Sequence, residues 1–192
     1  MASEHTATEQ QPEKYPTIWG ESYGFWCQTG ALLLAAIFAL IAIRSSRAIE
    51  RRKAAIATIF STRKDTELVG YIRTIGKIHS GDQSIAIYAR NDKIDDDHTK
   101  AIRYALNHYE YVAVGISEGI YDDNIFKSSN YSTIVRLYDR TKPYIEERRR
   151  LTNRHTIYQE LECLACRWKL KPLKTKQITA VQSNRFRNWL GF

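Results

Sequence analysis

The sequence predicts an all-α protein in which a single N-terminal transmembrane helix continues into a small cytoplasmic helical bundle. An uncharged apolar run extends from Gly24 to Ile43. Further along the chain, apolar residues recur at helical spacing. Only four Pro and nine Gly interrupt the 192 residues, which favours helices over a turn-rich β architecture.

The composition bounds the size and class of the protein. A chain of 192 residues has room for one domain plus appendages. The mean hydropathy of −0.46 excludes a polytopic membrane protein. The net charge of +8 predicts an anionic neighbour, which could be a lipid headgroup, a nucleic acid or an acidic protein. Three Cys are too few for a disulfide framework and indicate a reducing compartment.

The apolar run has the length of a membrane span. It reads GFWCQTGALLLAAIFALIAI, and only Gln28 and Thr29 are polar. Crossing the hydrocarbon core takes about 20 residues at about 1.5 Å each. Aromatic side chains that we expect at the membrane interface cluster at its start: Trp19, Tyr23 and Trp26. The acidic residues before the run and the arginines after it argue against a cleaved signal peptide.

The charges on either side of the apolar run predict its orientation. Four Glu and one Lys precede it, whereas the basic residues that follow it are Arg44, Arg47, Arg51, Arg52 and Lys53, opposed only by Glu50. Positive charge stays on the cytoplasmic side, so we expect the N-terminus outside and the C-terminal domain in the cytoplasm. The predicted location is a bacterial inner membrane.

The chain divides into five predicted segments. They are an extracytoplasmic disordered tail (1–17), a transmembrane segment (18–43), a membrane-proximal helix (44–70), a cytoplasmic helical domain (71–168) and a basic aromatic tail (169–192). Because no Pro or Gly occurs between Ile43 and Val69, we expect the membrane helix to continue to Val69 as one rod. Two short, weaker segments follow, punctuated by Gly70, Gly76 and Gly81.

The clearest soluble helix begins at the acidic cluster Asp95–Asp97, which supplies an N-cap and favourable charge. Its apolar stripe consists of Ile102, Ala105, Leu106, Tyr109, Val112, Ala113 and Ile116, and Gly119 is the predicted end.

Two more helices are predicted after a tight connection at Ile120–Ser128 with room for one helical turn. Ser129 or Asn130 is expected to cap the first of them, which Pro143 should bend. The second places one apolar stripe on a common face: Ile157, Leu161, Leu164, Ala165 and Trp168. Packed antiparallel against the rod, these helices would form a small bundle.

Three stretches resemble a known family. They are LNHYEYVAVGISEGIYDD, STIVRLYDRTKPYIEERR and TIYQELECLACRW, in that order within Ala101–Trp168. This segment resembles the bacterial domain-of-unknown-function family 4760. The resemblance implies a membrane-anchored helical module, in bacterial and sometimes phage or prophage proteins. It implies no reaction, and it carries no catalytic residue over to this chain.

The sequence offers few candidates for a metal, redox or catalytic site. The C-x-x-C of Cys163 and Cys166 is a weak candidate for a metal or redox site, because no further ligands occur at suitable spacing. The sequence contains no P-loop, H-E-x-x-H, G-x-S-x-G or dinucleotide fingerprint. We therefore expect no enzyme activity, no cofactor and no small-molecule substrate.

Two basic surfaces are candidates for binding an anionic partner. One is the helical patch of Arg148, Arg149, Arg150 and Arg154. The other is the tail, where aromatic residues are interleaved with Lys171, Lys174, Lys176, Arg185 and Arg187. Either lipid or protein could be the partner, whereas no nucleic-acid-binding motif is present.

The leading hypothesis is a membrane-tethered, non-enzymatic protein-interaction module. It could also self-associate through the small-residue series Ala31, Ala35 and Ala39. One alternative is a prophage- or host-encoded membrane effector that excludes phage. A second alternative is a cysteine-based metal or redox site within an oligomer.

Overall fold

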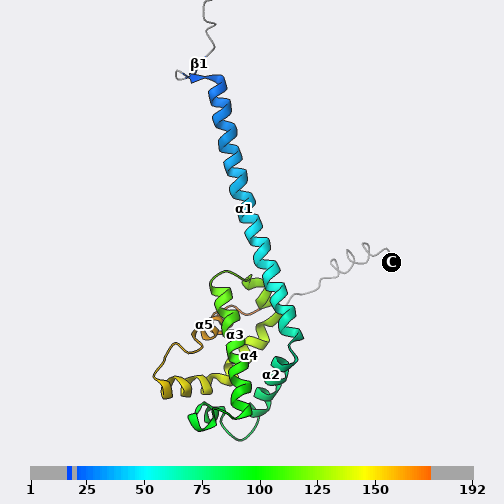
Figure 1. Cartoon of the computed structure of the whole chain (residues 1–192), viewed down its shortest axis with the longest axis vertical. Helices are drawn as coiled ribbons and strands as arrows, with labels where there is room; N and C mark the ends of the chain where they lie inside the picture. Colours follow the sequence, from blue (N-terminus) through cyan, green and yellow to red (C-terminus); the bar gives the residue numbers. More distant parts are fainter. Residues whose placement is uncertain (1–16, 19–20, 174–192) are drawn as a thin grey trace, which may run out of the picture. The chain divides into compact units, whose positions relative to one another are not determined.

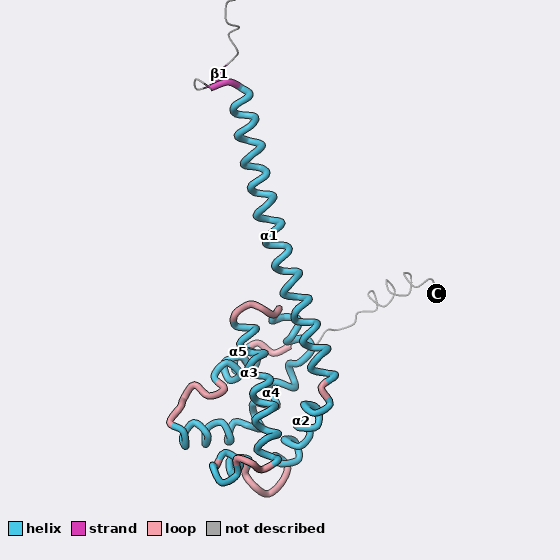
Figure 2. The backbone as a smooth tube through the Cα atoms, in the orientation of Figure 1, coloured by secondary structure: helices cyan, strands magenta, loops and turns pink. Residues whose placement is uncertain are grey.

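The computed structural model describes residues 17–18 and 21–173, and nearly all of them are helical (Figures 1 and 2). The five α-helices of this part of the chain are α1 (Tyr23–Lys64), α2 (Thr66–His79), α3 (Asp97–Ser117), α4 (Asp123–Thr152) and α5 (Gln159–Leu170). The 3₁₀ helices η1 (Ile85–Ala89) and η2 (Asn91–Lys93) connect α2 to α3. The predicted all-α fold class is confirmed.

The chain divides into two compact units, Met1–Arg47 and Ala48–Phe192. In the first unit, β1 (Thr17–Ile18) and β2 (Glu21–Ser22) form a two-residue antiparallel ladder directly before α1. The second unit, hereafter the helical domain, contains the end of α1 and all the later helices.

Helix α1 ends earlier than the sequence predicts. It stops at Lys64 rather than at Val69, because Asp65 leaves the helical conformation and caps α2. The Asp65 carboxylate accepts a hydrogen bond from the Leu68 backbone N–H at 2.9 Å. The prediction that glycines break this region was also wrong, since α2 runs through both Gly70 and Gly76.

Helix α3 begins and ends as predicted. Asp96, in the middle of the acidic cluster, is its N-cap and accepts a hydrogen bond from the His98 N–H at 2.8 Å. At the other end Gly119 adopts a left-handed φ of +68°, which a residue with a side chain rarely tolerates. The chain then turns back tightly, and the Ile120 and Tyr121 N–H groups both donate to the Gly115 carbonyl.

The start of α4 differs from the prediction. The helix begins at Asp123, and neither Ser129 nor Asn130 caps it. Asp122 is the N-cap and accepts a hydrogen bond from the Ile125 N–H at 3.1 Å. Where a connection with one helical turn was predicted, the residues from Asp123 onward already belong to α4, and Phe126 among them is buried.

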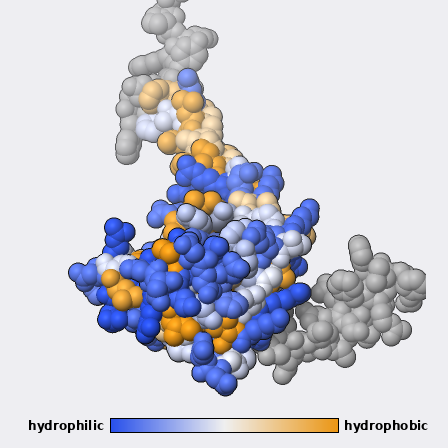
Figure 3. All heavy atoms as spheres, turned by 60° about the horizontal axis from the view of Figure 1, so that its bottom comes forward, coloured by the Kyte–Doolittle hydropathy of each residue, from blue (hydrophilic) through white to orange (hydrophobic). Residues whose placement is uncertain are grey.

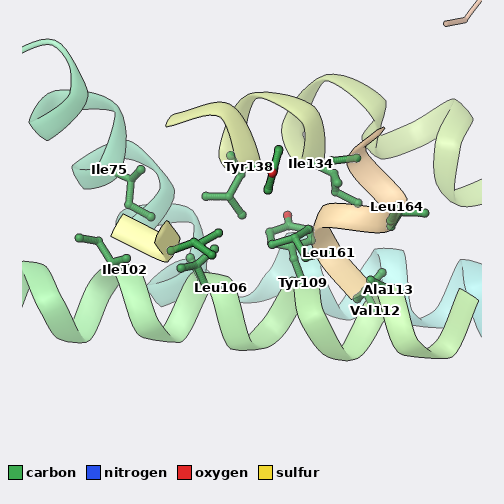
Figure 4. Packing of buried hydrophobic residues seen from close by; sticks show 14 of the residues in the cluster. Ile75, Ile102, Leu106, Tyr109, Val112, Ala113, Ile134, Tyr138, Leu161 and Leu164 are labelled. Carbon is green, nitrogen blue, oxygen red and sulfur yellow. The ribbon is translucent and has the colours of Figure 1, made fainter. Parts of the chain in front are cut away.

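The core of the helical domain lies between α2, α3, α4 and α5, and Ala55 and Ile59 of α1 and Ile85 and Ala89 of η1 also belong to it. Figure 4 shows the labelled side chains of these helices pointing into one shared space. The predicted stripe of α3 is buried throughout, at 6% exposure or less. The predicted stripe of α5 is buried from Leu161 to Trp168, whereas Ile157 precedes the helix and is only partly buried.

Helix α5 receives its N-terminal cap from another helix. Tyr158, the residue before α5, has a left-handed φ of 55° and provides no side-chain cap. Instead the Glu110 carboxylate of α3 accepts hydrogen bonds from the Glu160 and Leu161 N–H groups, at 3.2 and 2.8 Å. These bonds satisfy two donors that the first turn of a helix leaves without partners.

Candidate functional site

The first part of α1 is the clearest functional feature. Its large apolar side chains are exposed, among them Leu32 at 65% and Phe38 at 68%. Within the described residues, α1 is the one helix long and apolar enough to cross a membrane, and none of its apolar window is buried by protein. Of the predicted interfacial aromatic residues, Tyr23 and Trp26 lie exposed at the start of α1, and Trp19 lies outside the described residues.

The basic residues after the apolar run are all exposed on α1. In the helical domain, two of them contact acidic residues. Arg52 forms an ion pair with Asp122 at 3.6 Å, and Lys53 pairs with Glu50 at 3.2 Å. Both pairs are largely solvated on the basic side, so the positive surface remains open to an anionic partner.

The predicted arginine patch on α4 is mostly occupied within the domain. Arg148 donates to the Ala89 carbonyl at 3.1 Å and to the Asn91 amide oxygen at 3.0 Å. Arg149 donates to the Ile157 carbonyl at 2.9 Å. These two arginines therefore hold the 3₁₀ segment and the α4–α5 connection in place.

Arg149 also belongs to a small polar network between α4 and α5. It pairs with Glu162 at 2.7 Å, and the Tyr138 hydroxyl donates to the same carboxylate at 2.6 Å. The hydrogen bond from Tyr138, helped by Arg149, lowers the pKa of Glu162. Burial and the bond to Glu162 raise the pKa of Tyr138.

The rest of the predicted anionic-partner surface is only partly described. Arg150 is exposed and donates two hydrogen bonds to the Glu147 carboxylate. Arg154 and Lys171 are exposed, and Arg154 lies beyond the end of α4 rather than on the helix as predicted. The tail residues Lys174, Lys176, Arg185 and Arg187 lie outside the described residues.

The two cysteines of the C-x-x-C are both exposed on α5. Residues three apart on a helix share a face, so a partner could meet both thiols together. In residues 17–18 and 21–173, no group of three or more His, Cys, Asp or Glu is placed to hold a metal ion. A metal at these thiols would need ligands from outside the described residues.

The structure brings together polar residues at the corner between α1 and α2. Thr62 Oγ1 lies 3.0 Å from His108 Nε2, and the Tyr104 hydroxyl donates to Asp65 at 3.0 Å. Burial lowers the pKa of His108, although the charge of Asp65 partly opposes this. The capping bond from Leu68 is the main cause of a lowered pKa at Asp65.

Beside this corner lies a hollow of about 370 Å³. We call it the corner pocket, and it is lined by Thr62, Arg63, Leu68, Val69, Ile72, Arg73, Tyr109, Ser129, Asn130 and Thr133. These residues come from α1, α2, α3 and α4. Their spacing in the sequence carries no motif, which is why sequence reasoning missed the pocket.

These features define a class: an all-α protein whose helical domain follows an N-terminal helix long and apolar enough to span a bilayer. Residues 29–168 match the family model described as a domain of unknown function (DUF4760), and the chain belongs to this family. The match begins inside the apolar helix, well before the segment that showed the resemblance. No curated protein and no solved structure matches the chain.

Proposed function

We propose that this protein is a membrane-tethered, non-enzymatic interaction module at the cytoplasmic face of a bacterial inner membrane. The supporting observation is the contrast in burial along α1. The apolar window has no buried residue, while the helical domain builds its core from its own helices. An apolar helix that its own domain leaves uncovered needs lipid or another protein around it.

The orientation part of the proposal has the N-terminus outside and the helical domain in the cytoplasm. It is supported by the exposed basic residues that follow the apolar run. Thiol labelling of intact cells tests it, because Cys163 and Cys166 are exposed on the helical domain. In a Cys27→Ser background, a membrane-impermeant maleimide should label the protein only after the cells are lysed. Labelling of intact cells would contradict the orientation.

The surface of the helical domain offers places for a protein partner. The face drawn in Figure 3 is largely hydrophilic, with separate hydrophobic patches. Ile49, Ile56 and Phe60 are 45–58% exposed on the domain's part of α1. They recur at intervals of seven and four residues, so they share one helix face. A partner chain, or a second copy, would remove this apolar stripe from water.

A crosslinking pull-down from native membranes tests the interaction, with the protein tagged at its N-terminus. We expect a reproducible partner that is lost in the double variant Ile56→Asp/Phe60→Asp or on removal of residues 174–192. The matched control is Ser61→Asp, which adds a charge at an exposed position on another face of α1. Recovery of neither a partner nor a second copy would overturn the proposal.

A cysteine-based metal site is the second candidate function, favoured by the joint exposure of Cys163 and Cys166. Two chains that face each other could supply four thiolates, the ligand set of a structural zinc site. Purified protein should then contain about one zinc per two chains. Absence of stoichiometric zinc, with Cys163→Ser/Cys166→Ser unchanged in oligomeric state, would remove this candidate.

A further inference from the structure

Two polar side chains that have no hydrogen-bond partner in the described part of the protein open onto the corner pocket. Asn130 is 9% exposed and Tyr109 is 2% exposed. Both line the pocket, and no hydrogen bond joins the Asn130 amide or the Tyr109 hydroxyl to another described residue. Neither polar group is among the fully buried unpartnered atoms, so both keep contact with solvent. Figure 4 shows the Tyr109 hydroxyl pointing from α3 toward α4, the helix that carries Asn130.

Polar groups that face a hollow without a protein partner hydrogen-bond to water there, and a ligand with matching groups can replace that water. An amide has two donors and an acceptor, and a phenol can donate and accept. A pocket that presents both therefore suits a molecule with hydrogen-bonding groups of its own. Burial also raises the pKa of Tyr109 to about 12, so its hydroxyl stays protonated as a donor at neutral pH.

Two arginines give the pocket its charge. Arg63 and Arg73 line it, both are exposed, and none of the lining residues is acidic. Arg63 Nη2 donates to the Ser129 hydroxyl oxygen at 2.9 Å, which leaves the Ser129 proton and the other Arg63 nitrogens able to donate outward. Arg73 forms no ion pair or hydrogen bond through its side chain with the described residues. The occupant should therefore be an anion.

The donors at this pocket suit a phosphate. Two guanidinium groups and the hydroxyls of Ser129 and Thr133 offer more N–H and O–H groups than a carboxylate has oxygens. Leu68, Val69 and Ile72 add an apolar wall on the α2 side. The hollow of about 370 Å³ lies within the usual range for small-molecule sites.

We propose that the corner pocket binds a phosphate monoester, with its phosphate held by Arg63 and Arg73 and its organic part against Leu68, Asn130 and Tyr109. A soluble nucleotide and a lipid such as phosphatidic acid both carry this group. The binding function is independent of the proposed interaction module, because it uses neither the stripe on α1 nor the cysteines.

Calorimetric titration of the full-length protein in phosphatidylcholine nanodiscs tests the proposal. The soluble probes are the four ribonucleoside 5′-monophosphates, with the matching nucleosides as controls without phosphate. For the lipid source, the fraction of phosphatidic acid in the nanodiscs is raised, and direct lipid contact is read by photocrosslinking to a phosphatidic acid probe. We expect one source to bind, and a nucleotide to bind at least about tenfold more tightly than its nucleoside.

Variants distinguish binding at this pocket from nonspecific attraction of an anion to the basic protein surface. Arg63→Gln/Arg73→Gln should weaken binding by about tenfold or more, whereas Arg136→Gln, at an exposed position of α4 outside the pocket, should not. Asn130→Leu removes an unpartnered amide, so the apo protein should keep its melting temperature while losing affinity. The proposal is overturned if neither source binds at millimolar concentration, or if Arg136→Gln weakens binding as much as the double variant.

Discussion

Residues 23–43 and residues 48–64 both belong to α1, yet their apolar side chains have different surroundings. In the first stretch the large side chains are at least 41% exposed all around the helix, with Leu33 at 62% and Leu40 at 54%. In the second, Ala55, Ile59 and Thr62 are buried on one face, and Phe60 on another face remains 58% exposed. A helix that is apolar all round fits a membrane span or a fully covered core helix, whereas a one-sided stripe indicates packing on a soluble core.

The largest effect should come from placing charge in the first stretch. In Leu34→Arg/Ile37→Arg, each arginine costs about 2.5–3.5 kcal/mol near the centre of a spanning helix. The variant should therefore move from the carbonate-resistant membrane fraction to the soluble or degraded fraction. The matched control Ile56→Arg/Phe60→Arg changes two exposed apolar residues of the second stretch. If both double variants remain in the same fraction, the first stretch does not depend on a lipid environment more than the second.

The next effect is on folding of the helical domain. Leu161→Ala removes a fully buried side chain of α5 and should lower the free energy of unfolding by about 2–5 kcal/mol. Leu170→Ala, at a residue 83% exposed on the same helix, should change it by no more than about 0.5 kcal/mol. Denaturant titrations of both proteins, followed by tryptophan fluorescence in the same detergent, measure the difference.

Two glycines allow a comparison of a tightly packed and an open position, because Gly→Ala adds one methyl group at each. A Cβ at Gly115 would lie 2.2 Å from the Tyr121 ring, so Gly115→Ala should destabilise the domain by about 1–3 kcal/mol. A Cβ at Gly70, inside α2, meets nothing within 4 Å, and Gly70→Ala should stabilise by about 0.5–1 kcal/mol. Thermal unfolding of the two variants should shift in opposite directions, and a common direction would contradict the packing at Gly115.

Local signals in the sequence predicted much of this fold. The stripe of α3, its acidic start and its glycine end are periodic or capping features within one helix, and all three are confirmed. The start of α4 was missed because Asp122, Asp123 and Asn124 favour turns as well as helix caps. Burial of Phe126 favours the helix over a turn, and this burial arises only from packing against the rest of the domain.

The contacts that build the sites could not be predicted in this way. Glu110 caps α5 from 50 residues away, and the corner pocket joins residues of four helices. The sequence offered Arg148 and Arg149 as a surface for an anionic partner, yet each donates to a backbone carbonyl of another segment. Such pairings follow from tertiary packing, and no spacing rule within one helix indicates them.

The smallest expected effect is a pH dependence carried by Glu162. Because its pKa is lower in the folded protein than its usual 4.5, its ionised form stabilises the fold at neutral pH. This contribution is fully present above the usual pKa and is lost as the pH falls through the lowered value. Glu110 has the opposite sign, since burial raises its pKa, and comparing wild type with Glu162→Gln at each pH cancels its contribution. Unfolding free energies of the two proteins should therefore differ at pH 7, begin to converge below pH 4.5, the usual pKa, and converge fully only below the lowered pKa. A difference that stays constant with pH would assign the stabilisation to hydrogen-bond geometry rather than to the charge of Glu162.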